Sequence, residues 1–123
     1  MMVVLAIALG GAFGAMARFT VSSWSNRRFK HSPIGTLLVN LSGALALGIF
    51  VGLTEGQLNV SSEVNRLIVT GLLGSYTTFS TLMYETFILV ETEKPVLALL
   101  YAIGSLTAGL LAVLAGLGLA SLW

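Results

Sequence analysis

Two long runs of this chain contain no charged side chain. One covers residues 34–54 and the other covers residues 95–123, so they are 21 and 29 residues long. A helix needs roughly 20 predominantly apolar residues to cross the hydrocarbon core of a bilayer. Over the whole chain, 56% of residues are hydrophobic and 9% are charged, whereas a soluble domain carries about 25% charged residues. The sequence therefore predicts an all-α integral membrane protein that crosses the cell membrane several times.

Four apolar segments are long enough to span a bilayer, and the connections between them are short. We expect transmembrane helices at about residues 3–24, 33–54, 65–90 and 95–122. No linker or low-complexity tract separates them, so residues 1–123 form a single predicted domain. The first segment lacks a basic stretch before its apolar residues, which argues against a cleaved signal peptide. We interpret it as a retained helix, which places both termini on the same side of the membrane.

The basic residues of the connections are unevenly distributed. Cytoplasmic loops of membrane proteins carry an excess of lysine and arginine. The first and third connections contain four such residues, whereas the second connection and the termini have only Arg66. This bias favours a cytoplasmic location for the first and third connections. The four residues are Arg27, Arg28, Lys30 and Lys94.

Composition argues against several classes of function. The chain has no cysteine, so it can form neither a disulfide framework nor a thiolate metal site. Its formal net charge of +1 provides no electrostatic basis for binding nucleic acid. Only His31 would titrate near neutrality, and it lies in a connection beside basic residues. An enzyme is therefore the interpretation that we favour least.

Residues 71–81 interrupt the third apolar segment with glycines and hydroxyl side chains, among them Gly71, Gly74, Thr77 and Thr81. In lipid, an unpaired backbone polar group is costly, so irregular backbone persists only inside protein or beside a water-filled path. The stretch predicts a break in the third helix, with the two glycines supplying the flexibility of the turn. A break at membrane depth is a candidate site for an ion or a small polar solute.

Polar side chains also recur at helical spacing in the second and fourth segments. Thr36, Asn40 and Gly43 share one face of the second helix, while Tyr101 and Ser105 lie four residues apart in the fourth. The amide of a buried asparagine either joins helices or offers two N–H donors to an anion. Tyr101 suits an interfacial aromatic belt or a polar track inside the protein. We favour the polar track for Tyr101.

The third segment has a further polar pattern after the predicted break. Thr77, Thr81 and Glu85 follow one another at a spacing of four, which predicts a shared helix face. Threonine hydroxyls commonly bond back to a helical carbonyl, and a phenylalanine such as Phe79 usually packs in a core. A carboxylate within a span is costly and by default indicates a functional role. Glu85 is therefore the hardest of the four to explain by packing alone.

Gly10, Gly14 and Arg18 recur every four residues in the first helix and share one face. Small residues at this spacing let another backbone approach closely, so we interpret the glycines as ordinary helix packing. Arg18 leaves two interpretations open. Its side chain either snorkels to the headgroups from the end of the span, or it sets orientation and draws anions toward a vestibule.

Taken in order, these residues resemble the Fluc/CrcB family of fluoride channels. The resemblance covers nearly the whole chain and is carried by residues 10–18, 35–43 and 70–86, together with Tyr101 and Ser105. It implies a four-helix subunit with a broken third helix. It also implies an antiparallel dimer, in which two subunits of opposite orientation enclose two narrow pores. The implied function is passive export of cytoplasmic fluoride, which confers resistance to fluoride.

The resemblance also assigns residues to two kinds of ion site. A structural Na⁺ at the centre of the dimer would be held by backbone carbonyls, which by motif position belong to Gly74 and Thr77. We expect Arg18 and Glu85 to act at the pore entrance or in setting orientation. The implied fluoride pore is lined by Asn40, Phe79, Thr81, Tyr101 and Ser105.

One position departs from the family pattern. The family usually has a second phenylalanine three residues after the first, and here that position is Leu82. Leucine keeps the hydrophobic volume but lacks the positive ring edge of an aromatic side chain. Together with the uneven basic residues, this departure is compatible with a dimer of two different, oppositely oriented chains. We nevertheless favour the homodimer.

Two other functions are compatible with a small four-helix membrane protein. A small multidrug-type exporter would use Glu85 as a proton-coupled carboxylate, and its transport would depend on a pH gradient. A non-transporting assembly subunit would use its small-residue faces only for packing, and it would conduct no ion.

Overall fold

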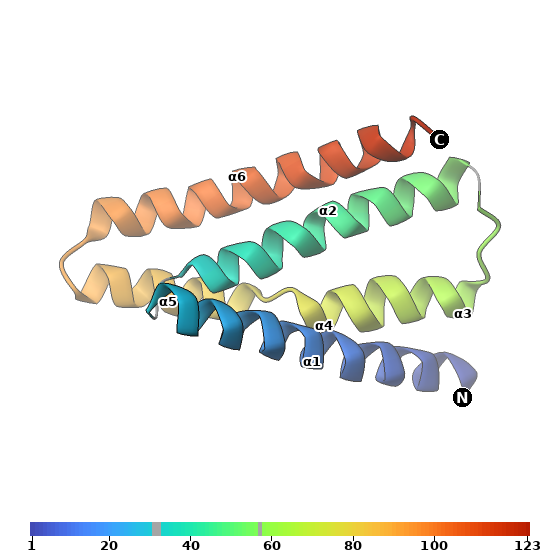
Figure 1. The fold of residues 1–123 in the computed structure, drawn as a ribbon, viewed down its shortest axis with the longest axis horizontal. Helices are drawn as coiled ribbons and strands as arrows, with labels where there is room; N and C mark the ends of the chain where they lie inside the picture. Colours follow the sequence, from blue (N-terminus) through green and yellow to red (C-terminus); the bar gives the residue numbers. More distant parts are fainter. Residues whose placement is uncertain (31–32, 57) are drawn as a thin grey trace.

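The protein is described by a computed structural model that covers residues 1–30, 33–56 and 58–123. His31, which we expected to be the only group that titrates near neutrality, lies outside the described residues. Throughout these three ranges, every regular element is helical (Figure 1), which confirms the predicted all-α class. The elements are α1 (Met2–Phe29), α2 (Ile34–Gly56), α3 (Ser62–Asn65), η1 (Arg66–Leu73), α4 (Gly74–Tyr76), α5 (Phe79–Glu91) and α6 (Pro95–Ala120).

Within the described ranges, three helices are long and apolar enough to cross a membrane: α1, α2 and α6. The third predicted span corresponds to four shorter elements, namely α3, η1, α4 and α5. Of these, η1 is a π-helix, a geometry that occurs rarely and often near functional sites. Whether these four elements together make a fourth crossing stays a prediction.

The first helix is longer than expected. We predicted that it ends near residue 24, but α1 continues to Phe29, where Lys30 adopts a left-handed conformation with φ of 48°. Arg27 and Arg28 occupy the last turn, where positive charge interacts favourably with the helix dipole. Arg18 consequently lies eleven residues before the end of α1, which corresponds to about 16 Å along the axis. It is therefore farther from the end of its helix than the sequence indicated.

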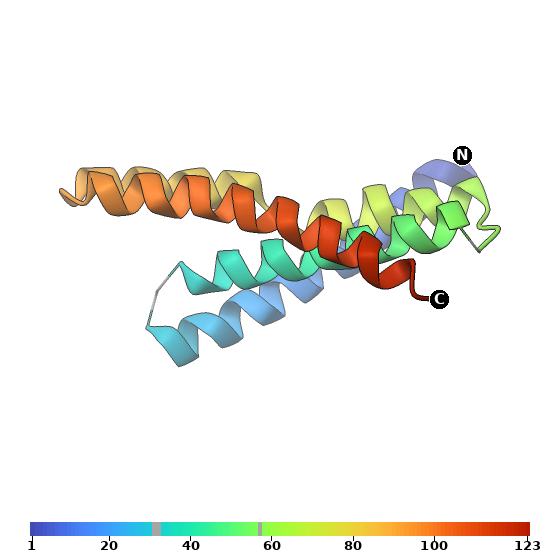
Figure 2. The same ribbon diagram turned by 90° about the horizontal axis from the view of Figure 1, so that it is seen from above.

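The long helices lie side by side along the molecule. Both termini and the connection between α2 and α3 lie at one end, and the α1–α2 and α5–α6 connections lie at the other (Figure 1). Seen from above (Figure 2), the α5–α6 pair and the α1–α2 pair diverge toward the end that carries their connections. Arg27, Arg28, Lys30 and Lys94 all lie in or near those connections, so the basic bias of the sequence is concentrated at one end of the molecule.

Close backbone approach at glycines holds two helix pairs together. Methyl groups on Gly10 and Gly14 of α1 would collide with the carbonyl oxygens of Leu67 and Leu72, and one on Gly71 would lie 2.7 Å from the carbonyl oxygen of Ile7. The packing interpretation of Gly10 and Gly14 is thus confirmed. The α2–α6 pair uses the same device, because a methyl group on Gly116 would lie 2.5 Å from the Leu45 carbonyl oxygen and one on Gly48 would overlap the Val113 carbonyl.

We predict that Gly14→Ala lowers the free energy of unfolding by about 1–3 kcal/mol, because the rigid backbone of η1 must move to admit the methyl group. Gly118→Ala is the matched control, since no described atom outside the adjoining part of its own helix lies within 4 Å of its new methyl group. The free energy of unfolding of the control should be unchanged or higher by up to about 1 kcal/mol, because alanine has a higher helix propensity than glycine. Thermal unfolding in detergent measures both variants, and equal midpoints for the two would contradict this account of the packing.

Candidate functional site

The third segment leaves helical geometry at two threonines. Thr77 has φ −75° and ψ 157°, and Thr78 has φ −146° and ψ 118°, which are extended values that β-branched residues adopt readily. Gly74 is helical, with φ −63° and ψ −31°, and no described glycine has a positive φ. Our expectation that the glycines supply the turn was therefore wrong. Gly71 instead permits the close approach of α1 and η1.

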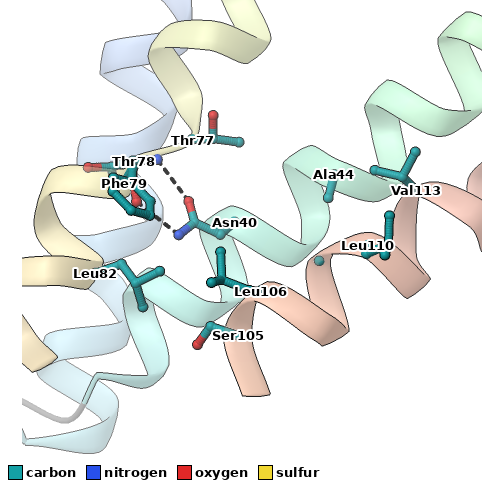
Figure 3. A pocket seen from close by; sticks show the side chains of 11 residues that line it. Asn40, Ala44, Thr77, Thr78, Phe79, Leu82, Ser105, Leu106, Leu110 and Val113 are labelled. Carbon is teal, nitrogen blue, oxygen red and sulfur yellow. Dashed lines mark hydrogen bonds between the residues drawn. The ribbon is translucent and has the colours of Figure 1, made fainter. Parts of the chain in front are cut away.

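Asn40 binds both backbone polar groups of Thr78. Its Oδ1 accepts from the Thr78 N–H at 2.8 Å, and its Nδ2 donates to the Thr78 carbonyl at 2.9 Å (Figure 3). The amide thus supplies hydrogen-bond partners to the backbone of a residue that is no longer helical. Without them, the Thr78 N–H and carbonyl would be unpaired, which is costly in an apolar setting. The second N–H of the amide has no partner among the described residues.

The side chain of Thr78 caps α5. Its hydroxyl accepts from the Thr81 N–H at 3.3 Å and lies 2.9 Å from the Thr81 hydroxyl and 3.3 Å from that of Ser80. Threonine is a favourable N-cap because its oxygen satisfies one of the free N–H groups of the first turn. The break is therefore bounded by a capped helix start rather than by a frayed end.

A pocket of about 400 Å³ opens beside the start of α5 (Figure 3). The Ser105 hydroxyl on α6 is buried and has no partner among the described residues. Phe79 stands at the other side of the pocket with 63% of its surface exposed. Leu82, at the position where the family usually has phenylalanine, is 3% exposed and contributes to the wall. The lining residues are Asn40, Ala44, Thr77, Thr78, Phe79, Leu82, Ser105, Leu106, Gly109, Leu110 and Val113.

The polar groups of this pocket include several hydrogen-bond donors. The start of α5 carries the positive end of the helix dipole, and the Asn40 amide and the Ser105 hydroxyl can both donate. No acidic or basic side chain is among the described residues that line it. A neutral, mostly apolar pocket with a few donors can bind a small anion weakly, without the strong ion pair that would hold it in place.

A second polar group joins three helices through Glu85. Thr36 of α2 donates to Oε1 of Glu85 at 2.8 Å, and Tyr101 of α6 donates to Oε2 at 2.6 Å. Glu85 lies on α5, three residues beyond Leu82. Each oxygen of the Glu85 carboxylate therefore accepts a hydrogen bond from a hydroxyl. These two bonds compensate for part of the free-energy cost of removing the carboxylate from water. This group links α2, α5 and α6 beside the pocket.

The structure places the predicted site residues in separate groups. Asn40, Phe79 and Ser105 line one pocket. Thr81 does not line that pocket, but its hydroxyl is hydrogen-bonded to Thr78, which does. Tyr101 does not line it and binds Glu85 instead.

The remaining predicted residues lie near the break or apart from it. Thr77 precedes α5, and its hydroxyl bonds back to the Leu73 carbonyl, so it does not share a continuous helix face with Thr81 and Glu85. Gly74 and Thr77 line a smaller pocket of about 220 Å³. Arg18 makes no hydrogen bond or ion pair with another described residue.

Sequence reasoning gave two residues of this site no binding role. The spacing of four did place Thr36 on the polar face with Asn40, but it did not predict the bond from Thr36 to Glu85. Thr78 could not be found in this way, because its backbone is bound by a side chain 38 residues away.

We predict that Tyr101→Phe lowers the free energy of unfolding by about 1–3 kcal/mol, because Glu85 would lose one of its two donors in a partly buried setting. Tyr84→Phe is the matched control on α5, since Tyr84 is 65% exposed and its hydroxyl has no hydrogen bond to the described residues. The control should stay within about 0.5 kcal/mol of the parent. Thermal unfolding of both variants tests this, and an equal effect of the two would contradict a structural role for the Glu85 group.

Comparison with known proteins gives a consistent result. A family described as "CrcB-like protein, Camphor Resistance (CrcB)" matches residues 5–117. A protein of Chloroflexus aurantiacus named fluoride-specific ion channel FluC is 44% identical over 117 residues, which cover 94% of this chain and 93% of that protein.

One organism, Moorella thermoacetica, has two such relatives. Its fluoride-specific ion channel FluC 2 is 43% identical over 108 residues, covering 87% of each chain. Its FluC 1 is 41% identical over 122 residues, covering 98% of this chain and 87% of that protein. With three long apolar helices and a family match over nearly its whole length, this multi-pass membrane protein belongs to the CrcB family.

Proposed function

We propose that this protein is a fluoride channel that releases cytoplasmic fluoride passively and so confers resistance to fluoride. The relatives named as fluoride-specific ion channels support the proposal. The observation that carries it is the unpartnered Ser105 hydroxyl, buried in a charge-free pocket at the positive end of α5. A buried hydroxyl without a partner is costly, and a small anion accepting from it would remove that cost.

The proposed pore uses weak donors because an ion must also leave. Conduction requires binding that is favourable enough for entry and weak enough for release. The edge of the Phe79 ring is positive, and it can face fluoride without a strong hydrogen bond. Thr81 and Tyr101 continue the path toward Glu85 in this proposal, and Arg18 attracts anions near an entrance. Asn40 contributes its remaining amide N–H.

The polar groups at the break support an inverted second subunit. Gly74 and Ser80 are exposed in the single chain, although they lie within three residues of the extended backbone at Thr77 and Thr78. Such groups are not tolerated against lipid and require protein or water around them. A second copy in the opposite orientation would bury the two breaks against each other, and the fluoride paths would then flank the shared surface.

The chemistry of the break fits the implied Na⁺. In a continuous helix, the Gly74 carbonyl would accept from the Thr78 N–H and the Thr77 carbonyl from the Thr81 N–H. Here Asn40 binds the first of these donors and the Thr78 hydroxyl binds the second. Both carbonyls are therefore deprived of the donors a helix would supply. Neutral backbone carbonyls in unwound helices are suitable ligands for Na⁺ at membrane depth.

The second subunit is either identical or a related chain. The basic residues at one end of the molecule favour one orientation, whereas a homodimer requires insertion in both. Two FluC relatives in Moorella thermoacetica are compatible with pairing between different chains. We favour the homodimer, because one chain already carries both the pocket and the break. A proton-coupled exporter that uses Glu85 remains the alternative function.

We predict that the chain, purified alone and placed in liposomes, loses fluoride rapidly and chloride negligibly, as a fluoride electrode and a chloride electrode would measure. Asn40→Asp should reduce fluoride loss by at least about tenfold, because it brings negative charge to the anion path. Phe79→Ile should also reduce it, because the positive ring edge is removed.

Equal rates for the two halides would contradict the fluoride proposal. Transport that requires a pH gradient would favour the exporter. Full fluoride flux from the chain alone would remove the need for a second, different chain.

We predict that Ser105→Ala reduces fluoride flux by about two- to tenfold, because one hydrogen bond to the ion is lost. Its stability should be unchanged or higher, since an unsatisfied buried group is removed. Ser25→Ala is the matched control, because the Ser25 hydroxyl is equally buried and unpartnered but lies against Gly35, outside the pocket. Ser25→Ala should conduct fluoride like the parent, and equal flux from both variants would contradict a role of Ser105 in the pore.

A further inference from the structure

The geometry points to a new role for Asn40. We propose that Asn40 is a positioning residue that holds the third segment open, so that the Gly74 carbonyl stays available as a cation ligand and Phe79 starts α5 at the pocket. The consequence for the cation rests on the proposed function. The effect on the backbone does not, because it follows from the two hydrogen bonds between Asn40 and Thr78.

The two bonds make Asn40 a substitute for backbone. A side-chain amide offers one acceptor and an N–H donor in a fixed plane, as a peptide group does. Oδ1 and Nδ2 of Asn40 bind the N–H and the carbonyl of the same residue at 2.8 and 2.9 Å. Without them, the nearest alternative for the Thr78 N–H is the Gly74 carbonyl, four residues earlier. Loss of the amide therefore favours a continuous helix through the break.

Closing the break would affect both sides of it at once. If the Thr78 N–H returned to Gly74, that carbonyl would be occupied and unable to bind a cation. Helical geometry at Thr77 and Thr78 would also rotate Phe79 about the axis, because each helical residue turns by a fixed angle. Since Thr77 lines both the larger and the smaller pocket, Asn40 couples the shape of one to the other.

The position of Asn40 explains how α2 controls the break. Gly43, one turn later on α2, has no side chain, and a methyl group there would collide with the Thr77 side chain. Thr36, one turn earlier, binds Glu85 on α5. The polar face of α2 therefore contacts both residues of the break and the helix after it. Among the described residues of this face, Asn40 is the one that binds the Thr78 backbone.

Hydrogen exchange at the Thr78 amide tests the proposal. The full chain, labelled with ¹⁵N-threonine in bilayer nanodiscs with Na⁺ and without fluoride, is compared with Asn40→Leu, which keeps the side-chain volume but removes both bonds. Loss of both bonds in Asn40→Leu, with closure of the break, should change Thr78 exchange by at least about tenfold. Asn40→Asp retains an acceptor for the Thr78 N–H and should exchange like the parent. Ser42→Ala is the matched control, because it removes an α2 hydrogen bond to Tyr76 and none to Thr78.

A second measurement follows the cation. Replacing N-methylglucamine by Na⁺ should raise the unfolding midpoint of the parent and of Ser42→Ala, and this increase should be lost in Asn40→Leu. If Asn40→Leu does not fold, Asn40→Ser provides the same comparison, because its hydroxyl is too short to reach both backbone atoms. Unchanged Thr78 exchange in Asn40→Leu or Asn40→Ser would overturn the proposal even if fluoride flux fell. The expected exchange pattern in a chain that conducts no fluoride would instead contradict only the proposed function.

Discussion

Two hydrogen bonds from the Asn40 amide to the Thr78 backbone allow the third segment to leave helical geometry inside an apolar protein. A membrane helix satisfies its own backbone, and lipid offers no replacement where that pattern stops. An interruption in the third segment is therefore tolerable only if other groups bind its N–H and carbonyl. Asn40 does this from α2, and the Thr78 hydroxyl does it locally. The arrangement requires α2 to lie directly against the break.

This requirement organises the neighbouring helices. Thr36 and Asn40 are one turn apart on α2. Thr36 binds Glu85 of α5 and Asn40 binds Thr78 at the break, so the order along α2 is the reverse of the order along the third segment. Tyr101 brings α6 to the same carboxylate that Thr36 binds. Farther along, close approach at Gly48 and Gly116 keeps α2 and α6 in register. Hydrogen bonds thus position α2, α5 and α6 relative to one another toward the end where the helix pairs diverge. Close backbone packing at glycines positions the helices elsewhere.

An interruption of a helix also places free N–H groups and free carbonyl groups within a few residues of each other. The start of α5 presents N–H groups and positive potential, whereas the residues before it present carbonyls that have lost their donors. Thr77 lines the pockets on both sides. One local feature therefore offers groups suited to an anion and groups suited to a cation, and none of the described residues that line either pocket is charged. This explains how a chain with so few charges can carry ion chemistry.

Part of the site was predictable from particular residues. The spacing of Thr36 and Asn40 predicted a polar face on the second helix, and the hydroxyls around Thr78 predicted an irregular third segment. The glycines were misread, since Gly71 serves packing and Gly74 remains helical. The predicted face of Thr77, Thr81 and Glu85 also failed, because spacing has a helical meaning only if the helix is continuous. The end of α1 was placed too early because two arginines were taken as a loop rather than as a favourable last turn.

Hydropathy and periodicity specified the membrane class, the long helices and the polar face of α2, because both are properties of neighbouring residues. The group that each polar side chain binds was specified only by the folded arrangement. Asn40 and Thr78 are 38 residues apart, and Thr36 and Glu85 are 49 apart. No local pattern specifies such pairs, since an amide can bind an anion, a helix or a backbone equally well by its chemistry. Its role is determined by which of these the packing of α2 brings within hydrogen-bonding distance.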